Sequence, residues 1–204
     1  MEIYSRDSGE VRHVTDHVRA LVVEHKGEVF ISHHDDNATV IKVNKYNITK
    51  KIITPIYSFP MKSSFPSYPS VSEKFIAMLD RDNNTLKLHN RRTEAPETST
   101  GLLAGLFSRR QQQLENITLK EFKRLLNLCF LPDGTLLVTG IDESKRKLNK
   151  YRLGEDPEKD ITLIWTCDEV PQASGIAVSE DGLIFVSGVK NKTIYVVSSD
   201  GKLM

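Results

Sequence analysis

The sequence contains little cysteine and no long apolar run. Only two of its 204 residues are cysteines, Cys129 and Cys167, too few for a disulfide scaffold and without the spacing of a zinc site. We therefore expect both to be reduced thiols in the core. Charged residues Glu2, Arg6 and Asp7 stand where a secretory signal would be apolar, and no later stretch approaches the roughly 18 apolar residues of a transmembrane helix. These absences predict a cytoplasmic protein that makes no contact with a membrane.

An excess of one charge is also absent. The chain carries 28 basic and 27 acidic residues, for a formal net charge of +1, and 39% of its residues are hydrophobic. This composition is typical of one ordinary globular domain. A dedicated nucleic-acid-binding domain often has a basic excess over its whole surface, so any binding to phosphates would depend on a local basic patch.

The sequence does contain a repeat. A strand-like apolar stretch, a polar turn and a second strand-like stretch recur from Gly27, Glu73 and Gly182, and a diverged copy begins at Asp133. The first stretch of each copy is continuously apolar, as in strands buried on both faces, whereas the second tends to alternate, as in half-buried strands. A period of this length indicates a repeat architecture.

Further strand-like stretches flank the copies. Two of the stretches that precede a copy lead into an Asp-Gly pair, Asp133-Gly134 or Asp181-Gly182, which favours a tight hairpin turn. With another stretch downstream, each unit contains four short antiparallel strands, and such units in series are typical of propeller blades. We predict an all-β fold, a β-propeller of four-stranded antiparallel blades.

The last copy carries a family resemblance. Its segments 175–187 and 191–202 resemble an NHL repeat, and they are similar to the repeats in the C-terminal propeller of tripartite-motif ubiquitin ligases. The resemblance implies a six-bladed ring. It also implies a longer parent protein with a RING, B-box or coiled-coil module, none of which is found in this sequence.

The repeats divide the chain into about four and a half blades. The N-terminus aligns with the third strand of a blade, and this opening hairpin is surplus to the last blade. We therefore expect a single propeller segment from a larger ring, whose open blade edges could pair with another copy; a closed four-bladed ring is the alternative. The expected boundaries are residues 1–14 for a half blade, 15–54, 68–122, 123–167 and 171–204 for the blades, and 94–113 for an inserted loop.

The candidate binding residues lie on one face of the predicted ring. In a meander blade, the turns between second and third strands lie at the same end as the blade-to-blade connections, and loops carry function more often than strands do. One connection has four aromatic residues among prolines, which could anchor a protein partner, stack on bases or simply cap the blades. The turns are rich in basic residues. The predicted partner-binding residues are Tyr57, Phe59, Phe65, Tyr68, Arg81, Lys145, Arg146, Lys147, Lys190 and Lys192.

Catalysis has less support in the sequence. The run from His33 to Asp36 is the only dense cluster of metal-ligand residue types, but other copies have unrelated residues at this turn, so we predict a variable solvated turn. No nucleophile-elbow, phosphate-loop or dinucleotide motif occurs, and we expect no catalytic residues, metal or cofactor. We predict a non-enzymatic scaffold that recognises a protein partner or substrate, as the targeting region of a tripartite-motif-type ubiquitin ligase would. RNA binding by the same face and a metal-dependent propeller hydrolase or lyase are the alternatives.

Overall fold

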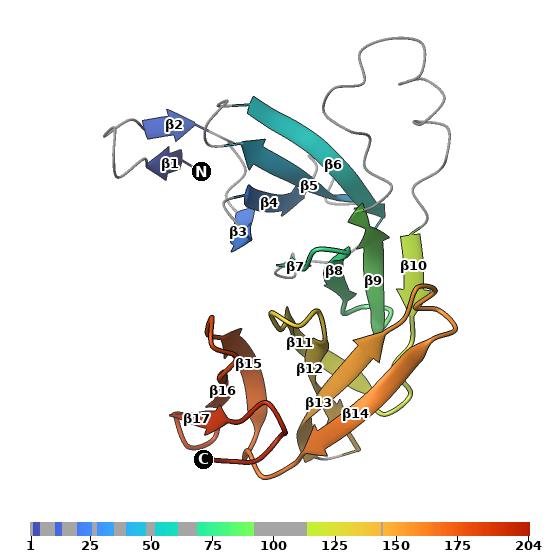
Figure 1. Ribbon diagram of the computed structural model, residues 1–204, viewed down its shortest axis with the longest axis vertical. Helices are drawn as coiled ribbons and strands as arrows, with labels where there is room; N and C mark the ends of the chain where they lie inside the picture. Colours follow the sequence, from blue (N-terminus) through green and yellow to red (C-terminus); the bar gives the residue numbers. More distant parts are fainter. Residues whose placement is uncertain are drawn as a thin grey trace. The chain divides into compact units, whose positions relative to one another are not determined.

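The computed structural model describes residues 2–4, 11–13, 20–25, 28–34, 40–47, 52–60, 69–91, 114–143 and 145–204. These residues belong to two compact units, Met1–Pro69 and Ser70–Met204. The regular elements of the described part are strands, β1 to β17. They form five sheets, and within each sheet strands that are consecutive along the chain pair antiparallel (Figure 1). No helix in these ranges is long and apolar enough to cross a membrane.

The first unit contains a hairpin and a four-stranded meander. Phe30, Ile31, Val43 and Tyr46 are buried, since they lie on the two central strands of the meander. The strands are β1 (Glu2–Tyr4) and β2 (Val11–His13) in the hairpin, and β3 (Ala20–His25), β4 (Glu28–His34), β5 (Val40–Asn47) and β6 (Ile52–Pro60) in the meander.

Strand β6 corrects one sequence expectation. The fourth strand of the first blade was expected to end by residue 54, with an irregular connection from Pro55 onward, but β6 continues to Pro60. That expectation was wrong because β6 is the edge strand of its sheet, where a proline removes no ladder hydrogen bond. The register also shifts where Val43 faces Tyr57 and Asn44 faces Pro55, and a bulge is another position that tolerates proline.

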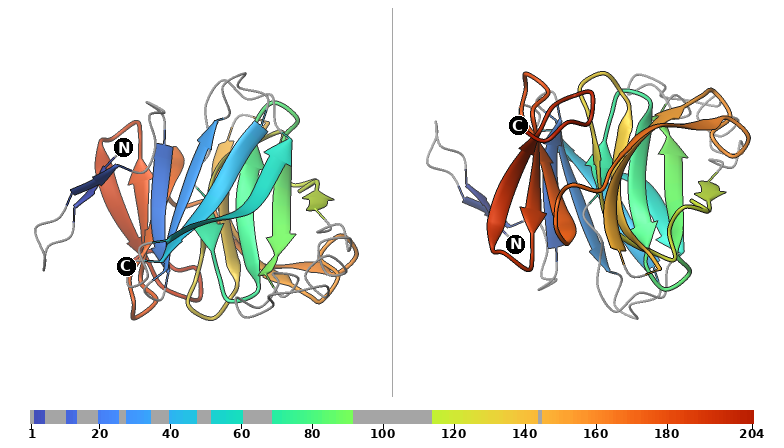
Figure 2. Two further views of the ribbon diagram at one scale, coloured as in Figure 1. Left: turned by 90° about the horizontal axis from the view of Figure 1, so that it is seen from above. Right: turned by 90° about the horizontal axis from the view of Figure 1, so that it is seen from below.

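The second unit contains three sheets in chain order. Two are four-stranded, and the last has three strands plus a bridge between Val197 and Leu203 at which a fourth begins. Figure 2 shows β15, β16 and β17 side by side in red. The strands are β7 (Ser70–Val71), β8 (Phe75–Asp80), β9 (Thr85–Asn90), β10 (Leu114–Ile117), β11 (Arg124–Phe130), β12 (Leu136–Asp142), β13 (Lys145–Leu153), β14 (Ile161–Cys167), β15 (Ala173–Val178), β16 (Ile184–Gly188) and β17 (Thr193–Val197).

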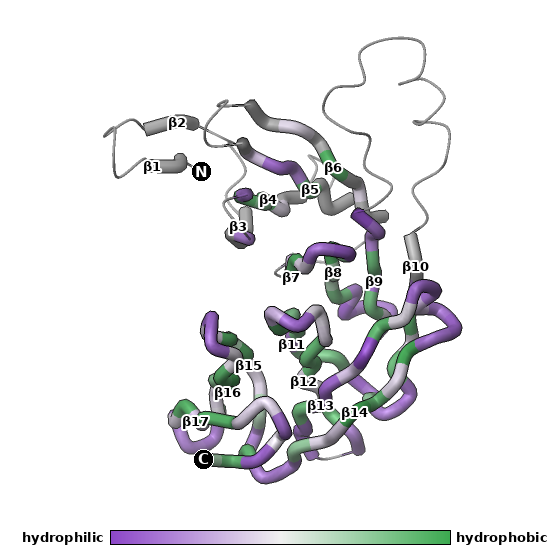
Figure 3. The backbone as a smooth tube through the Cα atoms, in the orientation of Figure 1, coloured by the Kyte–Doolittle hydropathy of each residue, from purple (hydrophilic) through white to green (hydrophobic). Residues whose placement is uncertain are grey.

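Two apolar clusters lie between these sheets. Leu136 and Val138 of β12 pack with Leu86 and Leu88 of β9, whereas Leu137, between them on the chain, packs with residues of β15 to β17. Both faces of β12 are therefore buried, because successive side chains of a strand point to opposite faces. This explains the continuous apolar stretches of the sequence, and Figure 3 shows β12 and β16 mostly green between purple turns.

One five-residue turn occurs three times in the second unit. In residues 131–135, 179–183 and 198–202, the first N–H donates to the fifth carbonyl and the fourth N–H donates to the first carbonyl. The fourth residue is a glycine with positive φ at each place: Gly134 (80°), Gly182 (84°) and Gly201 (87°). The repeat predicted from the sequence is thus a repeat of hydrogen bonds, and the all-β expectation with four-stranded antiparallel units is confirmed. The inserted loop 94–113 lies outside the described residues.

Candidate functional site

Turns and connections meet at one end of the three sheets in the second unit. Asn84, in the turn between β8 and β9, donates from Nδ2 to the Phe122 carbonyl (3.1 Å) and accepts from the Leu125 N–H (2.7 Å). In the same way, the Val189 N–H beyond β16 donates to the Gln172 carbonyl (3.2 Å) in the connection from β14 to β15. We call this end, formed by residues 81–84, 118–123, 143, 168–172 and 189–192, the connection face.

The turns of the connection face differ from those at the opposite end. Four residues other than glycine have positive φ among the described residues, and all lie here: Asn84 (53°), Glu143 (50°), Gln172 (56°) and Lys192 (53°). A left-handed backbone is unfavourable for residues with a side chain, and such residues gather at functional sites. The connection face therefore carries side chains at positions where the opposite end has glycine.

Two predicted binding residues are engaged within the protein. The Arg81 guanidinium donates from Nη2 to the Leu126 carbonyl (2.9 Å), which links the turn after β8 to β11. Lys147 Nζ lies 2.7 Å from Asp142 Oδ2. This hydrogen bond is the main cause that raises the pKa of Lys147 and lowers that of Asp142. Both basic residues therefore help to hold the connection face together.

The other basic residues have no such partner. Their side chains make no hydrogen bond or ion pair with the described part of the chain, and all but the half-buried Arg146 are exposed. These residues are Lys145, Arg146, Lys190 and Lys192. Lys145 to Lys147 were expected in a turn, but they begin β13, because Asp142 pairs with Lys145 and leaves only two residues to turn the chain. Glu143 has the positive φ that such a tight hairpin turn requires.

Arg146 lies on the side of its sheet that faces β15 to β17. Leu148, two residues further along β13, packs with Ile184 and Val186 of the last sheet. Lys150, two residues further again, contacts the Ser199 carbonyl (3.4 Å). Since every second side chain of a strand points the same way, Arg146 also points to the side of its sheet that faces the last sheet, at the end where Lys190 and Lys192 lie.

Exposed aliphatic side chains accompany these cations. Val189 is 55% exposed and Ile194 is 68% exposed, at either end of the turn from β16 to β17. Neither residue was predicted from the sequence, where this turn is notable only for its charge. The sequence signal for this exposed apolar surface was a valine and an isoleucine on either side of a lysine-rich turn.

The aromatic residues of the predicted site belong to the first unit. Tyr57 and Phe59 lie in β6, so they are strand residues rather than part of a connection. Phe65 and Tyr68 lie outside the described residues, and the aromatic part of the site stays a prediction. His33 and His34 end β4 instead of forming a turn. Asp35 and Asp36 are outside the described residues, and within the described part no three potential metal ligands gather.

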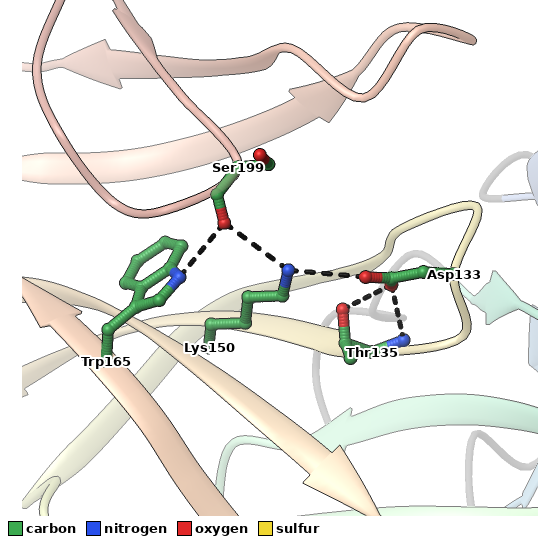
Figure 4. Close-up of polar contacts among 5 residues, drawn as sticks. All are labelled: Asp133, Thr135, Lys150, Trp165 and Ser199. Atoms are coloured by element: carbon green, nitrogen blue, oxygen red, sulfur yellow. Dashed lines mark hydrogen bonds and ion pairs between the residues drawn. The ribbon is translucent and has the colours of Figure 1, made fainter.

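A polar cluster at the opposite end joins the last two sheets (Figure 4). The Ser199 carbonyl accepts from Trp165 Nε1 (3.1 Å) and from Lys150 Nζ (3.4 Å). Lys150 Nζ also lies 3.3 Å from Asp133 Oδ2. Burial raises the pKa of Asp133. The hydrogen bonds from Thr135 and the charge of Lys150 outweigh this effect, so the pKa lies below its usual value. This cluster was not predicted from the sequence. Its signal was a lysine, Lys150, two residues after Leu148, where the alternation of the strand leads one to expect another apolar residue.

Comparisons with known proteins bear on the fold. No protein-family model matches the sequence, and no curated protein matches it. Among solved structures, a streptogramin B lyase is 13% identical with a TM-score of 0.60. A proposed 6-phosphogluconolactonase from Bacteroides uniformis is 16% identical (0.61), and virginiamycin B lyase from Staphylococcus aureus is 15% identical (0.61).

The chain has the fold of part of a β-propeller. Each match covers 100% of this chain but only 57%, 62% and 61% of those three propellers, in the same order. The chain therefore spans about three fifths of their length. At such low identity the similarity shows the propeller fold alone, and the NHL resemblance and the six-bladed ring stay predictions.

Proposed function

We propose that this propeller segment is a non-catalytic scaffold and that its connection face holds a protein partner. The observation that carries the proposal combines exposed aliphatic side chains with cations that have no side-chain partner among the described residues. The cations are Lys145, Arg146, Lys190 and Lys192, and the aliphatic residues are Val189 and Ile194. A protein interface combines an apolar centre with polar and charged groups at its rim. The combination suits a protein surface with both acidic and apolar residues.

RNA is the weaker candidate for the same face. Recognition of single-stranded RNA depends on aromatic rings on which bases stack. Within residues 69–91, 114–143 and 145–204 every phenylalanine, tyrosine and tryptophan side chain is buried or half-buried. Lys147 is paired with Asp142, and Lys123 lies 3.9 Å from Glu143, which reduces the positive potential available to phosphates.

A role in targeting extends this proposal. The last blade resembles an NHL repeat, and in tripartite-motif ubiquitin ligases the propeller selects the protein to be modified while the catalytic modules lie elsewhere in the chain. By this resemblance we propose that the bound partner is a substrate or adaptor of such a ligase. The proposal concerns a longer protein, of which these blades would be the recognition part.

The test places a photo-crosslinking amino acid at Lys190 or at Lys192 in living cells. We expect the same protein to be captured from both positions and identified by mass spectrometry. The control position is Lys159, an exposed lysine of the β13–β14 turn at the opposite end, from which this protein should not be captured. The captured protein is then purified, and its binding to the chain is measured directly.

Two outcomes would contradict the proposal. Equal capture from Lys159 would mean that the connection face has no special role. Capture of RNA from Lys190 and Lys192, sensitive to ribonuclease and with no protein in common, would favour the RNA alternative instead.

A further inference from the structure

We infer that Arg146, together with Lys190 and Lys192, forms a carboxylate-binding site between the last two sheets, and that its ligand is an acidic segment of the partner protein. The inference rests on the proposed function, because it names the chemistry that the connection face would recognise. A guanidinium can bind a carboxylate through two parallel hydrogen bonds, and a lysine ammonium adds charge without that geometry.

Arg146 has the position that such a site requires. Its side chain is half-buried, its backbone pairs with Ile141 in the regular ladder between β12 and β13, and it forms no ion pair within the described residues. A strand holds a side chain more firmly than a loop does, and a half-buried guanidinium is less screened by water than an exposed one. The Arg146 guanidinium is therefore held in place and has no charged partner in the described part of the chain.

The two lysines come from the neighbouring sheet. Their turn is fixed to the connection below it by the hydrogen bond from the Val189 N–H to the Gln172 carbonyl (3.2 Å). Val170 of the same connection is 1% exposed and belongs to the same apolar cluster as Leu148, so apolar side chains lie beneath the surface at this end. A ligand would accordingly bind at the surface, above these buried apolar side chains.

Charges at the two ends of the second unit favour an acidic ligand at this site. On the connection face, the nearby carboxylates of Asp142 and Glu143 face Lys147 and Lys123. Asp168 also attracts Lys147, and the other carboxylates of this face are Asp82, Glu121 and Glu169. The opposite end is acidic, so an acidic ligand is repelled there and attracted to the connection face. Its acidic residues include Glu155, Asp156, Glu158, Asp160, Glu180, Asp181 and Asp200.

The aliphatic side chains further restrict the class of acidic ligand that would fit. Val189 and Ile194 flank the lysine turn and are more than half exposed. Apolar surface of this kind gains free energy when an aliphatic residue covers it, which a phosphate cannot do. We therefore expect a segment in which glutamate or aspartate stands next to leucine, isoleucine or valine.

The experiment measures the binding of a fluorescein-labelled short peptide of alternating glutamate and leucine by fluorescence anisotropy. We expect Arg146→Gln to weaken binding about tenfold, which corresponds to one charge-assisted hydrogen-bonded pair. Arg146→Lys should fall between Gln and wild type, since it keeps the charge and loses the planar fork. A peptide with glutamine in place of glutamate should bind much more weakly than the acidic one.

The matched control is Arg152→Gln. Arg152 lies on the same strand and points to the same side of the sheet as Arg146, but it is exposed near the opposite end. We expect this variant to bind the acidic peptide like wild type. A thermal melt of each variant shows that the fold is kept, and Arg146→Lys supplies a conservative variant if Arg146→Gln is unstable.

Three results would overturn the inference. They are wild-type affinity of the Arg146 variants for the peptide, equal weakening by Arg152→Gln, and tighter binding of single-stranded RNA of matched charge that depends on the same residues. If Lys190 captures a protein partner but the Arg146 variants bind that partner normally, the carboxylate site is wrong and the proposed function stands. If Lys190 captures no partner and the peptide does not bind, both are wrong.

Discussion

At the scale of single residues, Lys192 and Asn84 occupy the same place in two different turns. Each is the fourth residue of a four-residue turn between the second and third strands, and each has a φ of 53°. Asn84 uses the position to bond the next sheet through both ends of its amide. Asparagine tolerates this backbone well, whereas lysine does not. The last blade thus has lysine at a backbone position that suits asparagine better, and under the proposed function its ammonium group is what the turn presents.

Replacement of Lys192 by asparagine tests whether lysine at this position makes the turn less stable. We expect Lys192→Asn to raise the free energy of unfolding by about 0.5 to 1 kcal/mol, because the strained backbone is relieved. The same variant should bind the acidic peptide more weakly. Urea denaturation measures the first effect, and Lys190→Asn is the control, because Lys190 has an ordinary backbone and should gain no stability. A Lys192 variant no more stable than the Lys190 variant would contradict the explanation.

His89 makes stability depend on pH. Its side chain is fully buried in β9, and burial, aided by the charge of Arg91, lowers its pKa from 6.5 to about 4. The unfolded chain therefore binds a proton at a higher pH than the folded chain does. The contribution of His89 to the free energy of unfolding is therefore complete above about pH 6.5 and is lost as the pH falls toward 4. At pH 5 the loss is about 2 kcal/mol.

Urea denaturation at pH 7 and pH 5 checks this prediction. His89→Gln should lose less stability between the two pH values than wild type does, whatever its stability at pH 7. The difference between the two proteins isolates His89 from the other histidines. If both lose the same amount, His89 is not the group that titrates.

At the scale of secondary-structure elements, Lys150 joins the turn 198–202 to the preceding sheet. Lys150→Met removes its contacts with the Ser199 carbonyl and Asp133, and we expect a loss of about 1 kcal/mol of stability. Amide exchange should accelerate most at Ser198, Lys202 and Met204, whose N–H groups bond within this segment. Lys159→Met is the control, because the exposed pair of Lys159 and Asp156 contributes little. Unchanged exchange at these amides would show that the turn does not depend on Lys150.

Most strands of the described residues could be predicted from the sequence, and the errors, one in each unit, have physical causes. The Asp-Gly pairs gave the turns correctly, because only glycine readily adopts the backbone at Gly134 and Gly182. The errors were at β6 and at the start of β13. Proline was read as a strand breaker in β6, although an edge strand tolerates it, and charge was read as a turn in β13, although a strand can begin with exposed lysines.

The candidate site could be predicted only in part. Basic residues near turns are visible in a sequence, but which of them the fold uses depends on neighbours that are distant along the chain. Arg81 is bonded to Leu126, and nothing local separates it from Lys190. The direction of Arg146 toward the last sheet follows from its register with Leu148, which required the strand boundaries.

At the scale of the whole chain, we expect the edge of β17 to favour self-association. The Val196 carbonyl accepts from the Met204 N–H, so Ile194, two residues earlier, also turns its backbone polar groups away from β16. Within the described residues nothing pairs with this part of the edge. An uncharged edge strand with an exposed isoleucine is prone to pair with another copy.

Light scattering after size-exclusion chromatography measures this tendency. We expect the wild-type mass to rise with concentration and Ile194→Lys to suppress the rise, since a charge on an edge opposes pairing. Leu163→Lys, at another exposed aliphatic residue on β14, is the control and should leave the rise unchanged. A wild-type mass that does not change with concentration would contradict the prediction.

The division of turn types between the two ends has a practical consequence for engineering. The glycine turns fix the backbone at one end, so a combinatorial library can leave them constant and randomise residues 189–192 together with Glu143 at the other. Variants of such a library would differ in what they recognise while sharing one framework, much as antibody loops vary on a constant support. A fragment of a propeller would then serve as a small, cysteine-poor starting point for selecting new binders.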